Sequence, residues 1–197
     1  RVLPVGQGRN HTGVACCRGR DAVDHGYDWL GTLCLGGLGS VYQATGEYGK
    51  AAECHEKSLV IVRKLGNEIG ESYTLEHLGN IYVIRGEYEK AADAYEKSLA
   101  IRRKHGRLKS QAASLNKLGS LYRTRRKLDK AMKYLKEALD ITRKIGDVRG
   151  EAASLNTLGE VCLAWGRYDD ALEYFEDSLD ITKEIGDVRG EAAGLNN

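Results

Sequence analysis

The sequence predicts an all-α solenoid of helix-turn-helix repeats, and three observations support this fold class. A Leu-Gly pair recurs every 40 residues, and its glycines are Gly39, Gly79, Gly119 and Gly159. Alanines keep the same step, at Ala51, Ala91, Ala131 and Ala171. Proline occurs once in 197 residues, at Pro4, so no proline breaks a helix in the repeat region. A fixed period of this length is typical of stacked structural repeats.

Composition and charge argue against a strongly charged partner. The chain has 30 Lys and Arg against 28 Asp and Glu, a net charge of +2. No apolar run approaches the roughly 18 residues of a membrane span, and no apolar secretory signal opens the chain. The five cysteines follow no regular spacing, as expected where thiols stay reduced. We therefore expect a soluble cytoplasmic protein without a membrane partner.

The chain divides into an atypical start and a repeat array. Residues 1–28 are rich in Gly and Arg and lack helical periodicity, so we expect a disordered or atypical segment there. The array covers residues 29–197, with repeats at about 32–71, 72–111, 112–151 and 152–191 and the start of a fifth at 192–197. Because the chain opens without Met and stops inside a repeat, we expect a fragment of a longer array.

Each repeat is predicted to hold two helices, and the first helix of repeat one is predicted to be weak. Gly31, Gly36, Gly37 and Gly39 all fall inside it, and glycine costs about 1 kcal/mol relative to alanine in a helix interior. Repeats two and three show the pair more clearly. Gly86 and Lys127 mark their first turns, and Gly106 and Gly146 mark their second turns.

Repeat four shows the two helical patterns best. The first helix carries an apolar face at three- and four-residue steps, formed by Leu155, Leu158, Val161, Cys162 and Trp165. Gly166 ends it, and a second helix starts near Tyr168 with a buried side predicted at Ala171, Leu172, Phe175, Leu179 and Ile181. Gly186 is predicted as the left-handed residue that ends this helix, and Asp187 as the next N-cap. Stability must come from stacking, since neither helix can bury its stripe alone.

These residues resemble the tetratricopeptide repeat family. Its pattern is matched by Leu75, Leu78, Gly79, Tyr82, Ala91, Tyr95 and Ser98, and again by Leu155, Leu158, Gly159, Cys162, Ala171, Phe175 and Ser178. We expect the glycine to let the two helices approach and the alanine to fill the contact opposite. The 40-residue period is longer than the commonest form of about 34, and is similar to repeats of G-protein-signalling-modulator (Pins-like) proteins and of kinesin light chains. The resemblance implies a right-handed superhelix that binds peptides.

The resemblance also implies which residues line the concave groove. The second, fifth, ninth and twelfth positions of each repeat would face it, which selects Tyr73, Glu76, Asn80, Val83, Asn116, Ser120, Arg123, Asn156, Glu160 and Leu163. Asn116, Asn156 and Asn196 form a ladder whose carboxamides could hold the backbone of an extended peptide. The alternative is that these asparagines are solvated or brace adjoining helices.

A basic surface on repeat three is a second candidate site. Residues 101–136 carry thirteen Lys and Arg against the single acid Asp129, whereas residues 157–184 carry eight acids against two basic residues. The surface comprises Lys117, Arg123, Arg125, Arg126, Lys127, Lys130 and Lys133. It could attract an acidic peptide, or it could complement acidic repeat four. Nucleic acid is disfavoured, because the only nearby aromatics, Tyr122 and Tyr134, occupy core-like positions.

The sequence offers no catalytic, cofactor or metal site. Cys16 and Cys17 lie between His11 and His25, but adjacent cysteines do not match the spacing of zinc ligands. We therefore expect a non-catalytic scaffold or signalling adaptor, without a cofactor, that binds a peptide or partner helix in the groove, with Arg123, Glu76 and Glu160 setting its charge preference. The alternative is a regulatory or sensor module of a larger signalling protein. Because Ala171, Phe175 and Leu179 would lack a following repeat, self-association or fraying is also predicted there.

Overall fold

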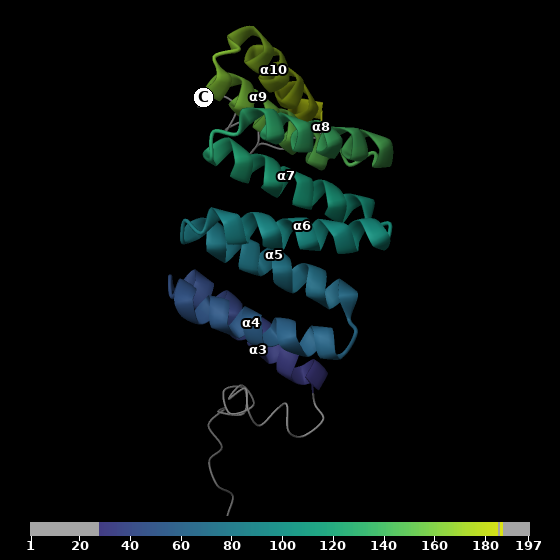
Figure 1. The fold of residues 1–197 in the computed structure, drawn as a ribbon. Helices are drawn as coiled ribbons and strands as arrows, with labels where there is room; N and C mark the ends of the chain where they lie inside the picture. The colour runs from purple at the N-terminus through teal and green to yellow at the C-terminus, as the bar shows by residue number, and fades with distance from the viewer. Residues whose placement is uncertain (1–27, 185, 187–197) are drawn as a thin grey trace, which may run out of the picture. The chain divides into compact units, whose positions relative to one another are not determined.

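A computed structural model of the chain describes residues 28–184 and Gly186. These residues form eight α-helices in chain order, which pair as the sequence predicts (Figure 1). Their bounds are α3 (Asp28–Ala44), α4 (Tyr48–Lys64), α5 (Glu68–Ile84), α6 (Tyr88–Lys104), α7 (Leu108–Thr124), α8 (Leu128–Ile145), α9 (Val148–Trp165) and α10 (Tyr168–Glu184). The chain falls into two compact units that divide inside α5, between Ile81 and Tyr82. None of the described helices has the length and hydrophobicity that crossing a bilayer requires.

The first unit contains the packed pair of α3 and α4 and most of α5. Leu35, Cys54 and Ile61 form its apolar cluster, with Leu38 and Tyr42 packed against them. Helix α3 forms in spite of its glycines. The prediction for residues 1–28 lies outside the described residues, apart from Asp28, the first residue of α3.

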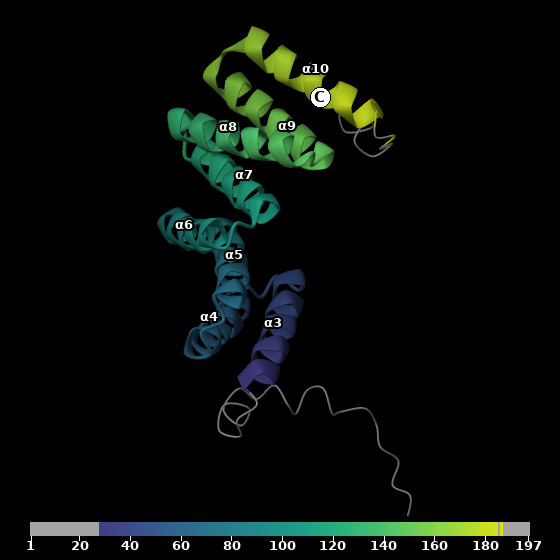
Figure 2. The ribbon, with the colours of Figure 1, turned by 90° about the vertical axis from the view of Figure 1, so that its right-hand side faces the viewer.

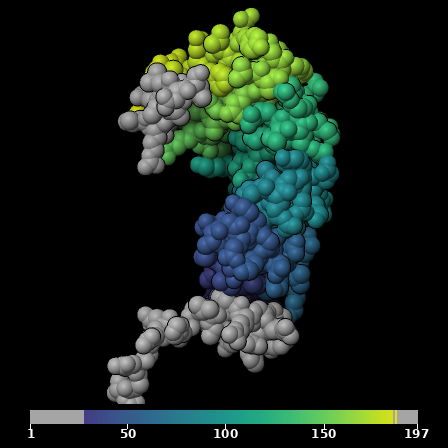
Figure 3. All heavy atoms as spheres, turned by 90° about the vertical axis from the view of Figure 1, so that its left-hand side faces the viewer, coloured from purple at the N-terminus to yellow at the C-terminus, as the bar shows by residue number. Residues whose placement is uncertain are grey.

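The second unit stacks its helices in chain order. Helix α6 packs on α7, α7 pairs with α8, α8 packs on α9, and α9 pairs with α10 (Figure 2). Their side chains fill the space between the ribbons (Figure 3). One continuous apolar core runs through this stack and includes Tyr95, Leu115, Leu121, Leu135 and Val161. The stacking thus buries the stripe that each helix could not bury alone.

The turns depend on left-handed residues. Gly46, Gly86 and Gly166 have φ values of 74° to 79° and lie in the first turns of their repeats. In repeat three the equivalent residue is Arg126, with φ 56°, the only non-glycine residue with positive φ in the described chain. Lys127 lies in the same turn, as predicted, and precedes α8 with φ −91°.

The close approach of the two helices is described for three repeats, and in each it involves a large side chain. A Cβ atom added at Gly159 would lie 2.7 Å from the ring of Phe175, and one added at Gly39 would lie 2.5 Å from Nε2 of His55. Gly119 faces Leu135 in the same way. The glycine therefore meets the large residue sixteen positions later. Ala171 is buried as predicted, and the atoms nearest to a Cβ at Gly159 are those of Phe175.

Repeat four departs from its predicted core at two positions. Leu155, Leu158, Val161 and Cys162 are buried, whereas Trp165 is exposed. Ala171 is buried and Phe175, Leu179 and Ile181 are half-buried, but Leu172 is exposed. Leu172 follows Ala171 directly, so it points about 100° away from the side of α10 that packs on α9.

Candidate functional site

The predicted groove residues lie in three stripes on first helices. Tyr73, Glu76, Asn80 and Val83 lie on α5, Asn116, Ser120 and Arg123 on α7, and Asn156, Glu160 and Leu163 on α9. Every one of them is half-buried or exposed. The α5 residues up to Asn80 belong to the first unit, and the other seven belong to the second. The structure therefore brings together the stripes of α7 and α9, with Val83 from the end of α5.

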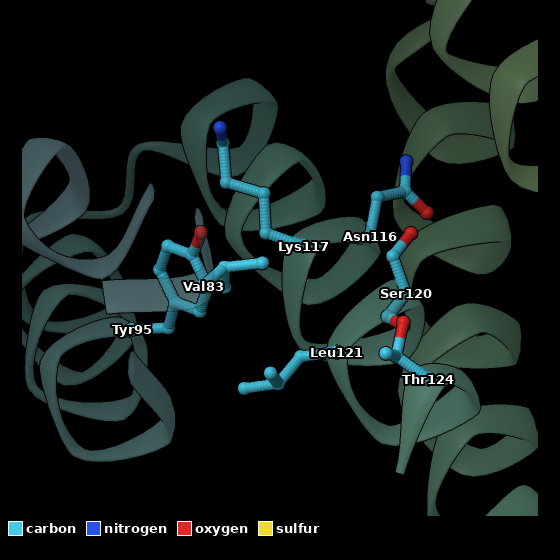
Figure 4. Close-up of a pocket in the computed structure, with 7 residues that line it drawn as sticks. All are labelled: Val83, Tyr95, Asn116, Lys117, Ser120, Leu121 and Thr124. Carbon is cyan, nitrogen blue, oxygen red and sulfur yellow. The ribbon is translucent and has the colours of Figure 1, made fainter. Parts of the chain in front are cut away.

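A hollow of about 240 Å³ opens on this face of the second unit. Val83, Tyr95 and Leu121 contribute apolar side chains to it. Asn116, Ser120 and Thr124 follow one another along one face of α7 and form a polar column at its side (Figure 4). Lys117 completes the lining. Three predicted residues, Val83, Asn116 and Ser120, thus meet at one concave site with apolar and hydrogen-bonding parts.

Asn116 connects α7 with α9 through Ser154. The Asn116 Nδ2 atom donates a hydrogen bond to Ser154 Oγ at 3.0 Å. Ser154 Oγ lies 2.9 Å from the carbonyl oxygen of Gly150 and 3.1 Å from Asn116 Oδ1, and its single proton can be donated to only one of them. With that proton on Gly150, the Asn116 side chain keeps its second N–H and its carbonyl oxygen for a ligand. Asn116 can therefore both brace two helices and bind.

Arg123 and Asn156 meet at Glu160. Arg123 Nη2 lies 3.1 Å from Glu160 Oε2, and Asn156 Nδ2 donates a hydrogen bond of 3.4 Å to Glu160 Oε1. The two charges oppose each other directly between α7 and α9. The column of Asn116, Ser120 and Thr124, by contrast, carries no charge.

Part of the basic surface of repeat three contacts neighbouring helices. Arg125 pairs with Glu89 of α6, Arg126 Nη1 donates to the carbonyl oxygen of Ala164 at 3.4 Å, and Lys130 Nζ lies 5.4 Å from the centre of the Tyr122 ring. Of the residues of this surface, Arg123 pairs with an acid of repeat four, Glu160.

The two tyrosines of repeat three pack against each other. The rings of Tyr122 and Tyr134 are stacked with centroids 5.5 Å apart, and both hydroxyls lie near Glu96. Burial, aided by Glu96, raises the pKa of Tyr122 to about 12. Tyr122 is buried in the core of the second unit and Tyr134 packs against it half-buried, so both occupy the core-like positions predicted.

Some predictions fall outside the described residues, and some site residues were not predicted. Asn196 of the asparagine ladder and the Cys16–Cys17 pair lie outside the described part of the chain. Within residues 28–184, no group of three or more His, Cys, Asp and Glu is placed to hold a metal ion.

Thr124 was missed, although its step of four from Ser120 on a predicted helix could have found it. Ser154 was missed because its bond to Asn116 spans 38 residues.

Comparisons with known proteins agree with this architecture. A tetratricopeptide repeat family model matches residues 32–104 and 110–184. BtubC (BKLC) from P. vanneervenii is similar in structure, with 23% identity, a TM-score of 0.75, and coverage of 81% of this chain and 66% of that chain. A STAND protein with a tetratricopeptide repeat sensor, PH0952 from Pyrococcus horikoshii, has 20% identity, a TM-score of 0.78, and coverage of 90% and 28%. No curated protein sequence matches the chain.

A third similar structure is a Rap protein complexed with Competence and Sporulation Factor. It has 16% identity and a TM-score of 0.66, with coverage of 80% of this chain and 44% of that chain. The chain thus spans less than two thirds of each of these three proteins, and at these identities the likeness concerns the fold alone. The family model covers well over half of the 197 residues, in register with the helix pairs. The chain therefore belongs to the tetratricopeptide repeat family.

Proposed function

We propose that the chain is a non-catalytic protein-binding module that holds an extended peptide or a partner helix along the exposed faces of α7 and α9. The observation that carries this proposal is the hollow beside Asn116, which joins an apolar floor to a polar column. An apolar side chain of the partner would fill the space between Val83, Tyr95 and Leu121. This burial contributes roughly 25 cal/mol per Å² of apolar surface removed from water.

The polar column would fix the direction of the bound segment. Asn116 offers an N–H and a carbonyl oxygen, the complement of a peptide group, and Ser120 and Thr124 repeat hydroxyls at steps of four residues. Hydrogen bonds of this kind are independent of the partner's side chains, so the apolar pocket would supply most of the selectivity. The Rap protein complexed with a factor supports a partner-binding use of this fold.

The experiment compares two variants that break the same hydrogen bond. Asn116→Ala removes the ligand-facing carboxamide and the bond to Ser154, whereas Ser154→Ala removes only the bond, because Ser154 is buried. Proteins captured from a nuclease-treated lysate should be retained by the parent chain and by Ser154→Ala, and lost by Asn116→Ala. Equal capture by all three forms would contradict the proposal, and equal loss from both variants would assign Asn116 to bracing alone.

A sensor role within a larger signalling protein is the second candidate. It is favoured by the similarity to the repeat sensor of the STAND protein. In this case the same groove would bind an effector and pass the binding energy to an output domain. The sequence of the encoding gene tests it: a nucleotide-binding or other output segment joined to the repeats supports the sensor role, and repeats alone contradict it.

A further inference from the structure

The groove has equivalent positions at two levels of the second unit, and they differ in two residues. Between α5 and α7, Val83 and Ser120 both line the hollow (Figure 4). Forty residues later, between α7 and α9, the same positions hold Arg123 and Glu160. An apolar and a small polar residue thus frame the first level, and two opposite charges frame the second.

Arg123 and Glu160 span the second level as an ion pair. Arg123 Nη2 lies 3.1 Å from Glu160 Oε2, and the two side chains are only 36% and 38% exposed. Asn156 donates a hydrogen bond to the other carboxylate oxygen. Among the described residues, the Nε atom of Arg123 is buried without a hydrogen-bond partner. Such an unsatisfied atom costs stability, which favours a functional reason for Arg123 at this position.

An apolar floor is present at both levels. Leu135 and Val161 hold the places of Tyr95 and Leu121, and they are 0% exposed, against 3% and 2%. The two levels therefore differ in the side chains that frame them rather than in the floor. An apolar side chain of a partner that enters between α7 and α9 must separate the ion pair and leave both charges partly desolvated, which is unfavourable.

On the basis of the peptide-binding role proposed above, we propose that Arg123 and Glu160 are specificity residues that limit the groove of the second unit to one large apolar side chain of its partner. That side chain enters the hollow beside Val83 and Ser120. The hollow of about 240 Å³ is smaller than the roughly 300–1,000 Å³ of a small-molecule site, so it suits a single side chain. The partner residue that faces the ion pair is polar or small.

The test exchanges the framing residues between the two levels. An opened form, Arg123→Val with Glu160→Ser, copies the first level at the second. A closed form, Val83→Arg with Ser120→Glu, copies the second level at the first. The probe is a library of random peptides displayed on phage and selected against each form. Circular dichroism and the urea midpoint show whether each form keeps the parent fold.

A matched control removes a different ion pair of the second unit with the same substitutions. Arg143 of α8 and Glu151 of α9 pair at 2.8 Å, and neither is a groove residue. Arg143→Val with Glu151→Ser should therefore enrich the same peptides as the parent. Peptides with a changed apolar pattern in this control would overturn the proposal, because any lost ion pair would then have the same effect.

The parent should enrich peptides with one large apolar residue at a fixed place. The opened form should enrich peptides with two, about three residues apart, since helices in contact lie roughly 8–10 Å apart and an extended chain advances about 3.3 Å per residue. The closed form should bind the parent's peptides at least about tenfold more weakly, because the burial of the apolar side chain is lost.

Two further results would overturn the proposal, and they can be told apart. If the opened form enriches the same pattern as the parent, Arg123 and Glu160 do not set the specificity, although the peptide-binding role stands. If the parent enriches no peptide, the peptide-binding role itself is wrong, and the specificity role is wrong with it.

Discussion

Single residues control how closely the two helices of a repeat approach. At Gly159 and Gly39 the space that a Cβ atom would fill is already occupied by Phe175 and His55. At Arg126 the backbone adopts a left-handed conformation that glycine adopts in the other first turns. These positions differ from the exposed glycines of α3, where a methyl group would meet nothing within 4 Å. Substitution of glycine by alanine should therefore lower the free energy of unfolding at some of these sites and raise it at others.

Gly159→Ala should lower the free energy of unfolding by about 2 kcal/mol, because the added methyl group forces the Phe175 ring and α10 away from α9. Gly36→Ala is the control, since its Cβ meets no atom within 4 Å. It should raise the free energy of unfolding by about 1 kcal/mol through helix propensity. Urea denaturation at low protein concentration measures both. Changes of the same sign in the free energy of unfolding of the two variants would contradict this explanation.

Arg126→Gly should stabilise the chain by about 1 kcal/mol, because it relieves the left-handed strain at φ 56°. The long hydrogen bond from Arg126 to Ala164 is lost in the variant, and contributes little at 3.4 Å. Arg126→Ala loses the same bond but keeps the strain, so the difference in urea midpoint between the two variants isolates the backbone effect. An Ala variant as stable as the Gly variant would argue against strain.

At the scale of helices, the contact between α3, α4 and α5 depends on a buried histidine. His55 is almost completely buried, its Nε2 has no hydrogen-bond partner, and its ring stacks on that of His77 with centroids 5.0 Å apart. Burial, and then the proximity of His77, lower the pKa of His55 to about 4 from 6.5. The corresponding positions in repeats three and four hold Leu135 and Phe175, which cannot take up a proton.

The stability of the first unit should therefore depend on pH. Between pH 6.5 and pH 4 the unfolded chain binds a proton at His55 that the folded chain excludes, so stability is complete above pH 6.5 and falls as the pH drops toward 4. The loss should approach about 3 kcal/mol. His55→Leu, which copies the pair of Gly119 and Leu135, should reduce this loss. Urea melts at pH 7.5 and pH 4.5 measure it, and equal pH dependence in both proteins would show that other groups are responsible.

Across the whole chain, the repeat period predicted the fold well and the site only in part. The 40-residue step gave the helix pairs and their glycine turns, because these depend on local patterns. It could not give the partner of Gly159 or the bond between Asn116 and Ser154, because these depend on how helices cross and on contacts 38 residues apart. Arg126 at a glycine position shows that neighbouring contacts can override a local preference.

Hydrogen exchange should reveal a gradient of stability along the repeats. Amides of α3 should exchange faster than those of α7, because Gly36 and Gly37 each weaken α3 by about 1 kcal/mol and the α7 residues Leu115, Leu118 and Leu121 belong to a continuous core. Mass spectrometry of peptides measures the order. Uniform protection of both helices would instead indicate that the repeats unfold as one unit.

The glycine in each first helix faces a different side chain in each repeat where the contact is described. His55, Leu135 and Phe175 fill the same place against Gly39, Gly119 and Gly159. Because the side chains of His, Leu and Phe differ in size, a single residue sets the distance between the two helices of each of these pairs. Exchanging these side chains among repeats should change the spacing of one helix pair at a time, without altering any residue of the proposed binding face.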